Sequence, residues 1–155
     1  MLDVTEQVLE LAPFRVRRRV KWGECDPAGV VYTARFCEYV ISAFELFMRH
    51  LLGSGFQGAK DEHGFGTPCK ALSLEFFASL RPDEEFDMTV LVAEIRNRTF
   101  DLDIRGRDPH GKDLFRARMT PITIKRGDRS RGIELPAMLR ARLEAYRAST
   151  MEKTG

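Results

Sequence analysis

The sequence has few cysteines and no arrangement that would use them together. Cys25, Cys37 and Cys69 are the only three, they form no Cys-x-x-Cys pair, and their odd number does not suit a disulfide framework. The three histidines and three cysteines also lack metal-ligand spacing, so we expect no metal site. A reduced protein of the cytoplasm is the simplest interpretation of these thiols.

Long hydrophobic runs and an excess of one charge are missing as well. No stretch approaches the ~18–20 apolar residues that cross a membrane, and the first seven residues are acidic where a signal peptide would be basic. The 25 Lys and Arg residues are balanced by 23 Asp and Glu residues, which leaves a net charge of +2. Nucleic-acid-binding proteins usually carry a larger basic excess. We therefore expect neither a membrane nor a nucleic-acid partner.

The chain has the length of one domain, and its apolar residues recur with clear strand and helix periodicities. Its 155 residues suit a single domain over residues 1–155, with a core over about residues 14–125. Residues 14–22 alternate apolar and basic side chains, which predicts a half-buried strand. Residues 1–12 have little pattern and predict a helical turn or a frayed arm. From about residue 33 to 52 only a narrow polar stripe interrupts apolar positions, which predicts a mostly covered helix.

The rest of the chain predicts strands and one more helix. Four apolar runs joined by short turns predict mainly antiparallel strands over residues 69–80, 86–95, 100–105 and 114–125. The glycine-rich residues 53–68 predict a loop, and a C-terminal helix is expected at about residues 136–147. The result is an α+β fold with about five strands around one long apolar helix. Its uncovered sheet edges predict a homo-oligomer.

Asp26 is the strongest candidate for chemistry. It lies in the loop Gly23-Glu-Cys-Asp-Pro-Ala-Gly29, between a strand and the start of the long helix. A carboxylate held near apolar groups becomes a better base or nucleophile. The helix start adds unpaired backbone N–H groups that can hold a developing oxyanion, a pairing that suits acyl transfer or hydrolysis. The alternative is that Asp26 only caps the turn before Pro27.

The segment Trp22-Gly-Glu-Cys-Asp-Pro-Ala-Gly-Val-Val-Tyr32, followed by an aromatic-rich helix, resembles the 4-hydroxybenzoyl-CoA thioesterase family of the hotdog fold. The resemblance covers roughly residues 14–125. It implies hydrolysis of an acyl-CoA thioester to a free acid and CoA, with an aromatic acyl group such as 4-hydroxybenzoyl or a short or medium acyl chain. It implies no cofactor, because CoA belongs to the substrate, and a site formed where the chains of a dimer or tetramer meet.

The resemblance also assigns roles within the loop and helix start. Asp26 would be the catalytic carboxylate, as nucleophile or as base for an attacking water. Backbone N–H groups near Tyr32 and Thr33 would polarise the thioester carbonyl. Gly29 and Val30 would contact the substrate.

Other side chains near the loop have weaker claims. A second branch of hotdog thioesterases carries its carboxylate on the helix, where Glu38 and Glu45 lie, but the loop Asp favours the interpretation that both belong to the polar stripe. Cys25 adjoins Asp26 without an evident His partner, which argues against a thiol nucleophile. His63 could line a substrate mouth.

A basic strand connection is the second candidate region. Arg96, Arg98 and Thr99 match the segment that meets the nucleotide end of CoA in the resembling enzymes, and arginines can hold phosphates with paired hydrogen bonds. The alternative is a solvated hairpin tip. The basic run at residues 125–131 is either a second phosphate contact or a surface connection.

Two other functions remain open at this stage. The same hydrolysis could act on acyl groups carried by acyl carrier protein, because both carriers present a phosphopantetheine arm. A non-catalytic hotdog module that binds acyl-CoA would keep the fold and the pocket without turnover.

Overall fold

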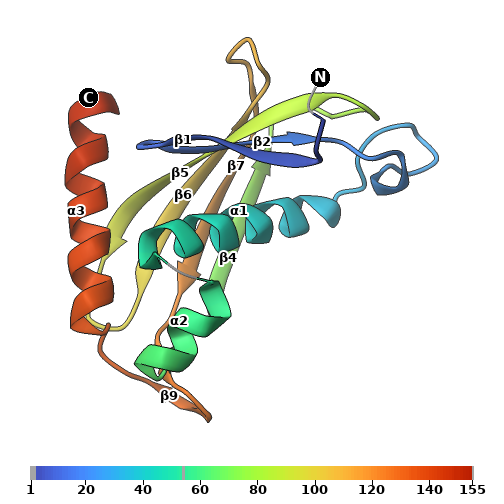
Figure 1. The fold of residues 1–155 in the computed structure, drawn as a ribbon. Helices are drawn as coiled ribbons and strands as arrows, with labels where there is room; N and C mark the ends of the chain where they lie inside the picture. Colours follow the sequence, from blue (N-terminus) through green and yellow to red (C-terminus); the bar gives the residue numbers. More distant parts are fainter. Residues whose placement is uncertain (1–2, 54, 155) are drawn as a thin grey trace.

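The computed structural model describes residues 3–53 and 55–154, and its centre is a six-stranded antiparallel sheet with the order β1-β2-β5-β6-β7-β4 (Figure 1). The strands are β1 (Glu6–Leu11), β2 (Phe14–Arg19), β4 (Cys69–Phe76), β5 (Glu85–Ile95), β6 (Phe100–Arg107) and β7 (Asp113–Pro121). A small sheet contains β3 (Phe65–Gly66), β8 (Ile124–Lys125) and β9 (Asp128–Gly132). The helices are the short 3-10 turn η1 (Trp22–Glu24), α1 (Arg35–Leu52), α2 (Phe56–His63) and α3 (Ala137–Thr154). The predicted α+β arrangement is confirmed.

Aromatic side chains fill the space between α1 and the sheet. Phe36 and Tyr39 of α1 contact Phe86 of β5 and Phe115 of β7 in a ring of tilted and edge-to-face pairs, with centroids 5.1–5.9 Å apart. Gly106 of β6 lies directly beside Phe115, and a Cβ atom there would stand 2.1 Å from the ring. Only glycine lets β6 pass this ring, so the close packing of the core is specified at that position.

The C-terminal helix α3 is joined to the sheet through the hydroxyl of Tyr146. This buried oxygen accepts the Phe14 N–H at 2.8 Å and donates to the carbonyl of Val90. Phe14 of β2 and Val90 of β5 are paired residues. The Tyr146 hydroxyl therefore bridges the N–H of one and the carbonyl of the other, two groups that would otherwise bond to each other across the strands. The helix continues to Thr154, beyond the predicted end at about residue 147.

Several sequence predictions about the ends and connections were wrong. The N-terminal lead-in forms β1, because its residues pair with β2 and bring Glu6 opposite Arg18. The main sheet therefore has six strands where about five were expected. The glycine-rich loop contains α2, which ends at Gly64 in the left-handed conformation. The basic run at residues 125–131 is exposed, and β8 and β9 form a hairpin there.

The inward-facing positions of β2 hold one unexpected residue. Phe14, Val16 and Val20 are buried as predicted, and Arg18 occupies the position between Val16 and Val20 with a largely buried side chain. Trp22, predicted to continue this apolar face, is 84% exposed, because β2 ends at Arg19 and η1 turns the chain. A buried guanidinium needs a buried anion, and that anion lies in the candidate site.

The outer face of the sheet is charged. Three aspartates that alternate with core residues are almost fully buried beneath arginines from neighbouring strands, namely Asp87, Asp101 and Asp103. Arg116 holds Asp103 with two hydrogen bonds of 3.0 Å, and Arg17 holds Asp87 at 2.7 and 3.0 Å. Such forked pairs have the strongest geometry available to surface charges.

Candidate active site

The Asp26 loop is a small hairpin closed by its own backbone. Cys25 and Val31 form a bridge, the Asp26 N–H donates to the carbonyl of Val30 at 2.9 Å, and the Gly29 N–H donates to the carbonyl of Asp26 at 2.9 Å. Gly29 has a φ of 80°, which glycine adopts without strain. The turn therefore holds Asp26 in a defined position between η1 and the start of α1.

Asp26 is one of the residues that line a hollow. Its Oδ1 accepts the Ala28 N–H at 2.8 Å, as in the expected turn cap, while Oδ2 has no hydrogen-bond partner among the described residues. The hollow has a volume of about 400 Å³ and is lined by Trp22, Gly23, Cys25, Asp26, Pro27, Gly29 and Pro82. Capping the turn thus leaves one carboxylate oxygen available to a ligand.

The free backbone N–H groups before α1 begin at Thr33, one residue after Tyr32. The Tyr32 N–H donates to the carbonyl of Glu24 at 3.0 Å, so it is already occupied within the chain. The N–H groups of Thr33 and Ala34 take part in no hydrogen bond among residues 3–53 and 55–154. Of the two predicted amides, Thr33 is the one that can face a carbonyl oxygen.

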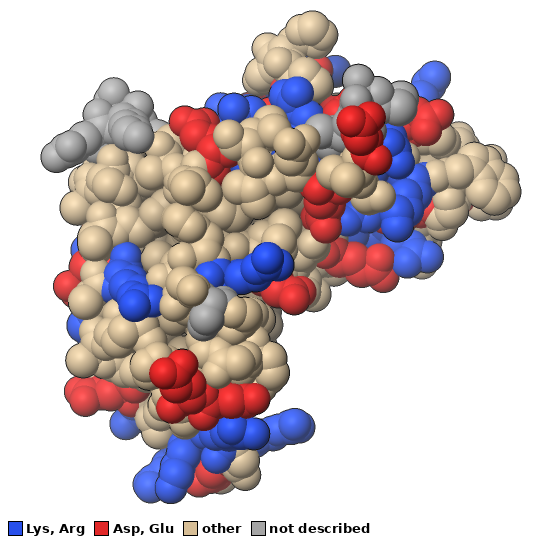
Figure 2. All heavy atoms as spheres, viewed as in Figure 1, with Lys and Arg blue, Asp and Glu red and all other residues tan. Residues whose placement is uncertain are grey.

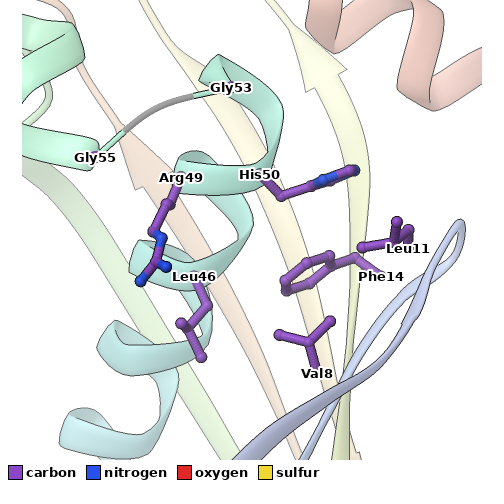
Figure 3. A pocket seen from close by; sticks show the side chains of 8 residues that line it. All are labelled: Val8, Leu11, Phe14, Leu46, Arg49, His50, Gly53 and Gly55. Atoms are coloured by element: carbon purple, nitrogen blue, oxygen red, sulfur yellow. The ribbon is translucent and has the colours of Figure 1, made fainter.

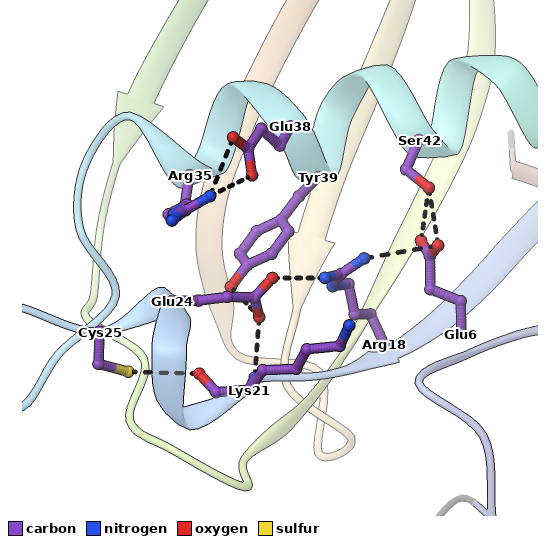
Figure 4. Close-up of polar contacts among 9 residues, drawn as sticks. All are labelled: Glu6, Arg18, Lys21, Glu24, Cys25, Arg35, Glu38, Tyr39 and Ser42. Atoms are coloured by element: carbon purple, nitrogen blue, oxygen red, sulfur yellow. Dashed lines mark hydrogen bonds and ion pairs between the residues drawn. The ribbon is translucent and has the colours of Figure 1, made fainter.

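Glu24 is the residue that the sequence predictions missed. Its side chain is buried, and its carboxylate accepts hydrogen bonds from the Lys21 N–H, the Tyr39 hydroxyl and the Arg18 guanidinium (Figure 4). Glu6 and Ser42 extend this network away from the loop. Arg18 is the signal that could have revealed it, because an arginine in the inward phase of a strand requires a carboxylate nearby.

The predicted phosphate-binding segment is partly used by the protein itself. Arg96 donates to Asp101 at 2.6 and 3.0 Å and to the Thr99 hydroxyl at 3.0 Å. Burial works to raise the pKa of Asp101, but the hydrogen bonds from Arg96 and Thr120 outweigh it and hold the pKa below its ordinary value. Arg96 and Thr99 therefore hold the β5–β6 turn. Arg96 and Arg98 are both exposed, and the Arg98 side chain makes no such bond with another described residue.

A cationic hollow lies beside Arg98, under the β8–β9 hairpin. It has a volume of about 640 Å³, and its lining combines Lys60, Arg129 and Arg131 with apolar and small residues, namely Gly66, Thr67, Pro68, Ile122, Ile124, Ser130 and Gly132. The Thr67 hydroxyl is buried without a hydrogen-bond partner in the described chain. Figure 2 shows basic side chains gathered at this lower tip of the molecule.

Within one folded chain, the Asp26 loop and the cationic hollow lie far apart, near opposite ends of β5. The loop adjoins the beginning of β5, because Val20 bonds to Glu84, whereas Arg96 to Thr99 follow its end. β5 has 11 residues, which corresponds to about 35 Å of extended strand. Figure 1 shows the same separation, with the loop beyond one end of α1 and β9 at the lower tip. A single chain does not bring the two groups together.

Of the remaining candidates, Cys25 lines the Asp26 hollow, whereas Glu38, Glu45 and His63 line neither hollow. Glu38 forms an exposed ion pair with Arg35 at 3.0 Å, and Glu45 is exposed on α1. Burial, with the nearby charges of Glu24 and Asp26, raises the pKa of the Cys25 thiol and disfavours the thiolate. His63 ends α2 and is exposed, and it does not line the cationic hollow.

A third hollow lies at the C-terminal end of α1 (Figure 3). Its volume is about 600 Å³, and Val8, Leu11, Phe14 and Leu46 form its apolar part. The ring of His50 stacks on Phe14 with a centroid distance of 5.6 Å. None of the predicted site residues lines it.

No group of three or more His, Cys, Asp or Glu side chains in the described ranges is arranged to hold a metal ion. No helix among the described residues is long and apolar enough to pass through a bilayer.

Comparison with solved structures identifies the same fold in several proteins. A 1,4-dihydroxy-2-naphthoyl-CoA thioesterase from Synechocystis is 21% identical with a TM-score of 0.75, over 84% of this chain and 94% of that one. The 4-hydroxybenzoyl-CoA thioesterase of Pseudomonas sp. strain CBS-3 is 21% identical with a TM-score of 0.72, over 83% and 96%. A Staphylococcus aureus protein in complex with CoA is 11% identical with a TM-score of 0.81, over 96% and 89%.

The search of curated proteins returned no match. The family comparison, in contrast, matches most of the sequence: residues 20–143 fit the Thioesterase-like superfamily, a range that includes the Asp26 loop, α1 and the strands from β4 to β9. The chain therefore belongs to the Thioesterase-like superfamily.

Proposed function

We propose that the protein hydrolyses acyl-CoA thioesters to a free acid and CoA, with Asp26 as the catalytic carboxylate. The observation that carries this proposal is that Asp26 lines a hollow with one carboxylate oxygen unpaired among the described residues. The same segment leaves the Thr33 N–H without a partner in the described chain. Family membership and the similarity to acyl-CoA thioesterases support it.

The chemistry follows from these two groups. The Thr33 N–H donates to the thioester oxygen and stabilises the negative charge that develops there. Asp26 either attacks the carbonyl carbon or removes a proton from an attacking water. In the base route, water forms the C–O bond, the C–S bond breaks, and Asp26 passes the proton it took from water to the leaving thiolate. In the nucleophilic route, Asp26 forms the C–O bond and expels the thiolate as an acyl anhydride forms. Water then hydrolyses the anhydride, which releases the acid, restores the Asp26 carboxylate and supplies the proton that the thiolate takes up. Gly29 lines the same hollow, and the Val30 carbonyl holds the Asp26 N–H, so both shape the site through the backbone.

The cationic hollow suits the phosphates of CoA. Arg129 and Arg131 supply charge-assisted donors, and the unpaired Thr67 hydroxyl supplies a buried one. Arg98 adds a further cation from the β5–β6 turn, where its Cδ lies within 3.4 Å of a Cβ built on Gly132. Ile122 and Ile124 offer apolar surface for the rest of the nucleotide.

The distance between the two regions predicts a dimeric site. A pantetheine arm is as long as about four or five extended residues, or ~15–18 Å, which is about half of the ~35 Å along β5. A two-fold partner paired along the edge strand β4 places its Asp26 loop beside this chain's cationic hollow, because antiparallel pairing sets the Phe76 end of one strand beside the Cys69 end of the other. Leu72, Phe76 and Phe77 are exposed on this edge, which fits such a partner.

The first test is the substitution Asp26→Asn, with Asp83→Asn as its control. Asp83 is exposed in the neighbouring turn with a φ of 70°, which Asn tolerates. Thiol release from a panel of aromatic and aliphatic acyl-CoAs should fall at least ~100-fold in D26N and stay near the wild-type rate in D83N. Near-normal release by D26N contradicts the proposal, and tight acyl-CoA binding by the wild type without release indicates a non-catalytic binding protein. Adding acyl-carrier-protein thioesters to the panel compares the two carriers.

The second test mixes a variant that lacks turnover with a variant that binds acyl-CoA weakly, and measures the rate at substrate concentrations well below the raised KM. The double substitution R129Q/R131Q should raise the KM for acyl-CoA, while D26N removes turnover. If each site combines the Asp26 of one chain with the hollow of the other, dissociating and reassociating the two variants restores about a quarter of the wild-type sites. Absence of any recovery in mixed dimers contradicts the shared site.

A further inference from the structure

We propose that Glu24 is a positioning residue for the reaction, whose carboxylate fixes the loop that carries Asp26 and whose carbonyl sets which N–H group faces the substrate. The inference rests on the proposed function of Asp26. Its basis is the buried network of Figure 4, in which Glu24 contacts β2 through Arg18, α1 through Tyr39, and the connection before η1 through Lys21.

Three donors converge on this carboxylate. Oε1 accepts the Lys21 N–H at 2.8 Å and the Tyr39 hydroxyl at 3.0 Å, and Oε2 accepts Nη2 of Arg18 at 2.5 Å. A carboxylate accepts at both oxygens, whereas an amide offers one acceptor and one donor. Glutamine at this position would therefore place an NH₂ group against a donor whichever way it turned.

Burial makes these bonds difficult to replace with water. Glu24 is 8% exposed, and the Arg18 guanidinium lies 4.6 Å from the centroid of the Tyr39 ring. Burial and the adjacent Glu24 raise the pKa of Tyr39, so its hydroxyl keeps the proton that it donates. A buried pair of opposite charges loses much more when one partner is removed than an exposed pair does.

The backbone of Glu24 connects this network to the reacting groups. Its carbonyl accepts the Tyr32 N–H, directly beside the bridge between Cys25 and Val31. That bond is the first rung of the hairpin whose turn holds Asp26. It also occupies the N–H of Tyr32 and leaves that of Thr33 for a ligand. A shift of Glu24 would move the carboxylate and the N–H group relative to each other.

The test compares Glu24→Gln with Glu6→Gln. Glu6 belongs to the same network, where it pairs with Arg18 at 3.4 Å and accepts the Ser42 hydroxyl, but it does not touch the loop. Because a misplacement of about 1 Å can cost ~100-fold in rate, E24Q should lower kcat by ~10–100-fold. Its KM should stay within about 2-fold, because the proposed phosphate contacts lie elsewhere. E6Q should retain kcat within about 3-fold.

Trp22 provides a readout that does not depend on turnover. It is the only tryptophan, it lies in the turn that Glu24 closes, and it is exposed. E24Q should lower its fluorescence anisotropy and E6Q should not. If E24Q does not fold, Tyr39→Phe removes one donor and keeps the carboxylate, and it should give a smaller change in both measurements.

The outcomes separate this inference from the proposed function. Equal kcat values and equal anisotropies for E24Q and E6Q overturn the role of Glu24, as does a loss of activity that only matches the unfolded fraction. Full activity of D26N overturns the proposed function, and lower anisotropy in E24Q would still identify the loop contact.

Discussion

Replacing Tyr146 with Phe tests how α3 is attached to the sheet. The substitution removes a single oxygen, which accepts the Phe14 N–H at 2.8 Å and donates to the carbonyl of Val90. The aromatic contact with Phe47, at a centroid distance of 4.8 Å, remains possible for a phenylalanine ring. The measured effect therefore isolates the two hydrogen bonds.

The expected cost follows from the groups left behind. Phe14 and Val90 are both buried, so their backbone N–H and C=O groups lose a partner without gaining water. Each buried unsatisfied group costs about 1–3 kcal/mol, and a small closure of the strands would recover part of it. We expect Y146F to lower the free energy of unfolding by about 2–4 kcal/mol, which corresponds to a fall in Tm of about 6–12 °C at this chain length.

Urea unfolding followed by circular dichroism measures this change, with Tyr32→Phe as the control. The Tyr32 side chain is 55% exposed, and its hydroxyl makes no hydrogen bond among the described residues. Y32F should therefore change the stability by less than about 0.5 kcal/mol. A loss below about 1 kcal/mol in Y146F would refute the reasoning, since it would mean that the strands bond directly once the hydroxyl is gone.

Further predictions concern pH, the core and the β5–β6 turn. Burial raises the pKa of Tyr146 to about 12, above the ~10 of an unfolded chain, so its contribution is complete below pH ~10 and is lost as the pH rises towards 12. Urea titrations should show a fall of about 2–3 kcal/mol over that window, and a smaller fall in Y146F. Gly106→Ala should cost at least ~2 kcal/mol in the same assay, because its methyl group would overlap Phe115. Arg98→Gln should raise the KM for acyl-CoA with little effect on stability, whereas Arg96→Gln should mainly lower the Tm by breaking its pair with Asp101.

The sequence was most informative where one periodicity persists. The helical stripe predicted α1 to within two residues at its start, and the alternating runs predicted β5 and β6. β1 was not predicted, because its side chains are mostly exposed and its pairing depends on contacts with β2, such as that between Glu6 and Arg18. The secondary structure of a strand at the sheet edge depends on its partner more than on its own pattern.

In the candidate site, too, the sequence revealed some residues and not others. Asp26 stands out because a carboxylate between two glycines and a proline is conspicuous in a loop. Arg96 was predicted to hold phosphate, yet it pairs with Asp101 in the next strand, and spacing alone does not reveal such a pair. Glu24 was overlooked because Arg18 and Tyr39, which bury its carboxylate, belong to a strand and a helix on either side of it, and only the fold brings the three together.

The network of arginine–aspartate ion pairs on the outer face of the sheet affects how further copies of the protein could pack on that face. Arg105, Arg116 and Arg118 keep 40–47% of their side-chain surface in water while they hold Asp101 and Asp103. Stacking a second sheet on this face would require that water to leave without an apolar surface to compensate for its removal. Contacts between dimers over this face would therefore stay hydrated, and their strength would vary with ionic strength.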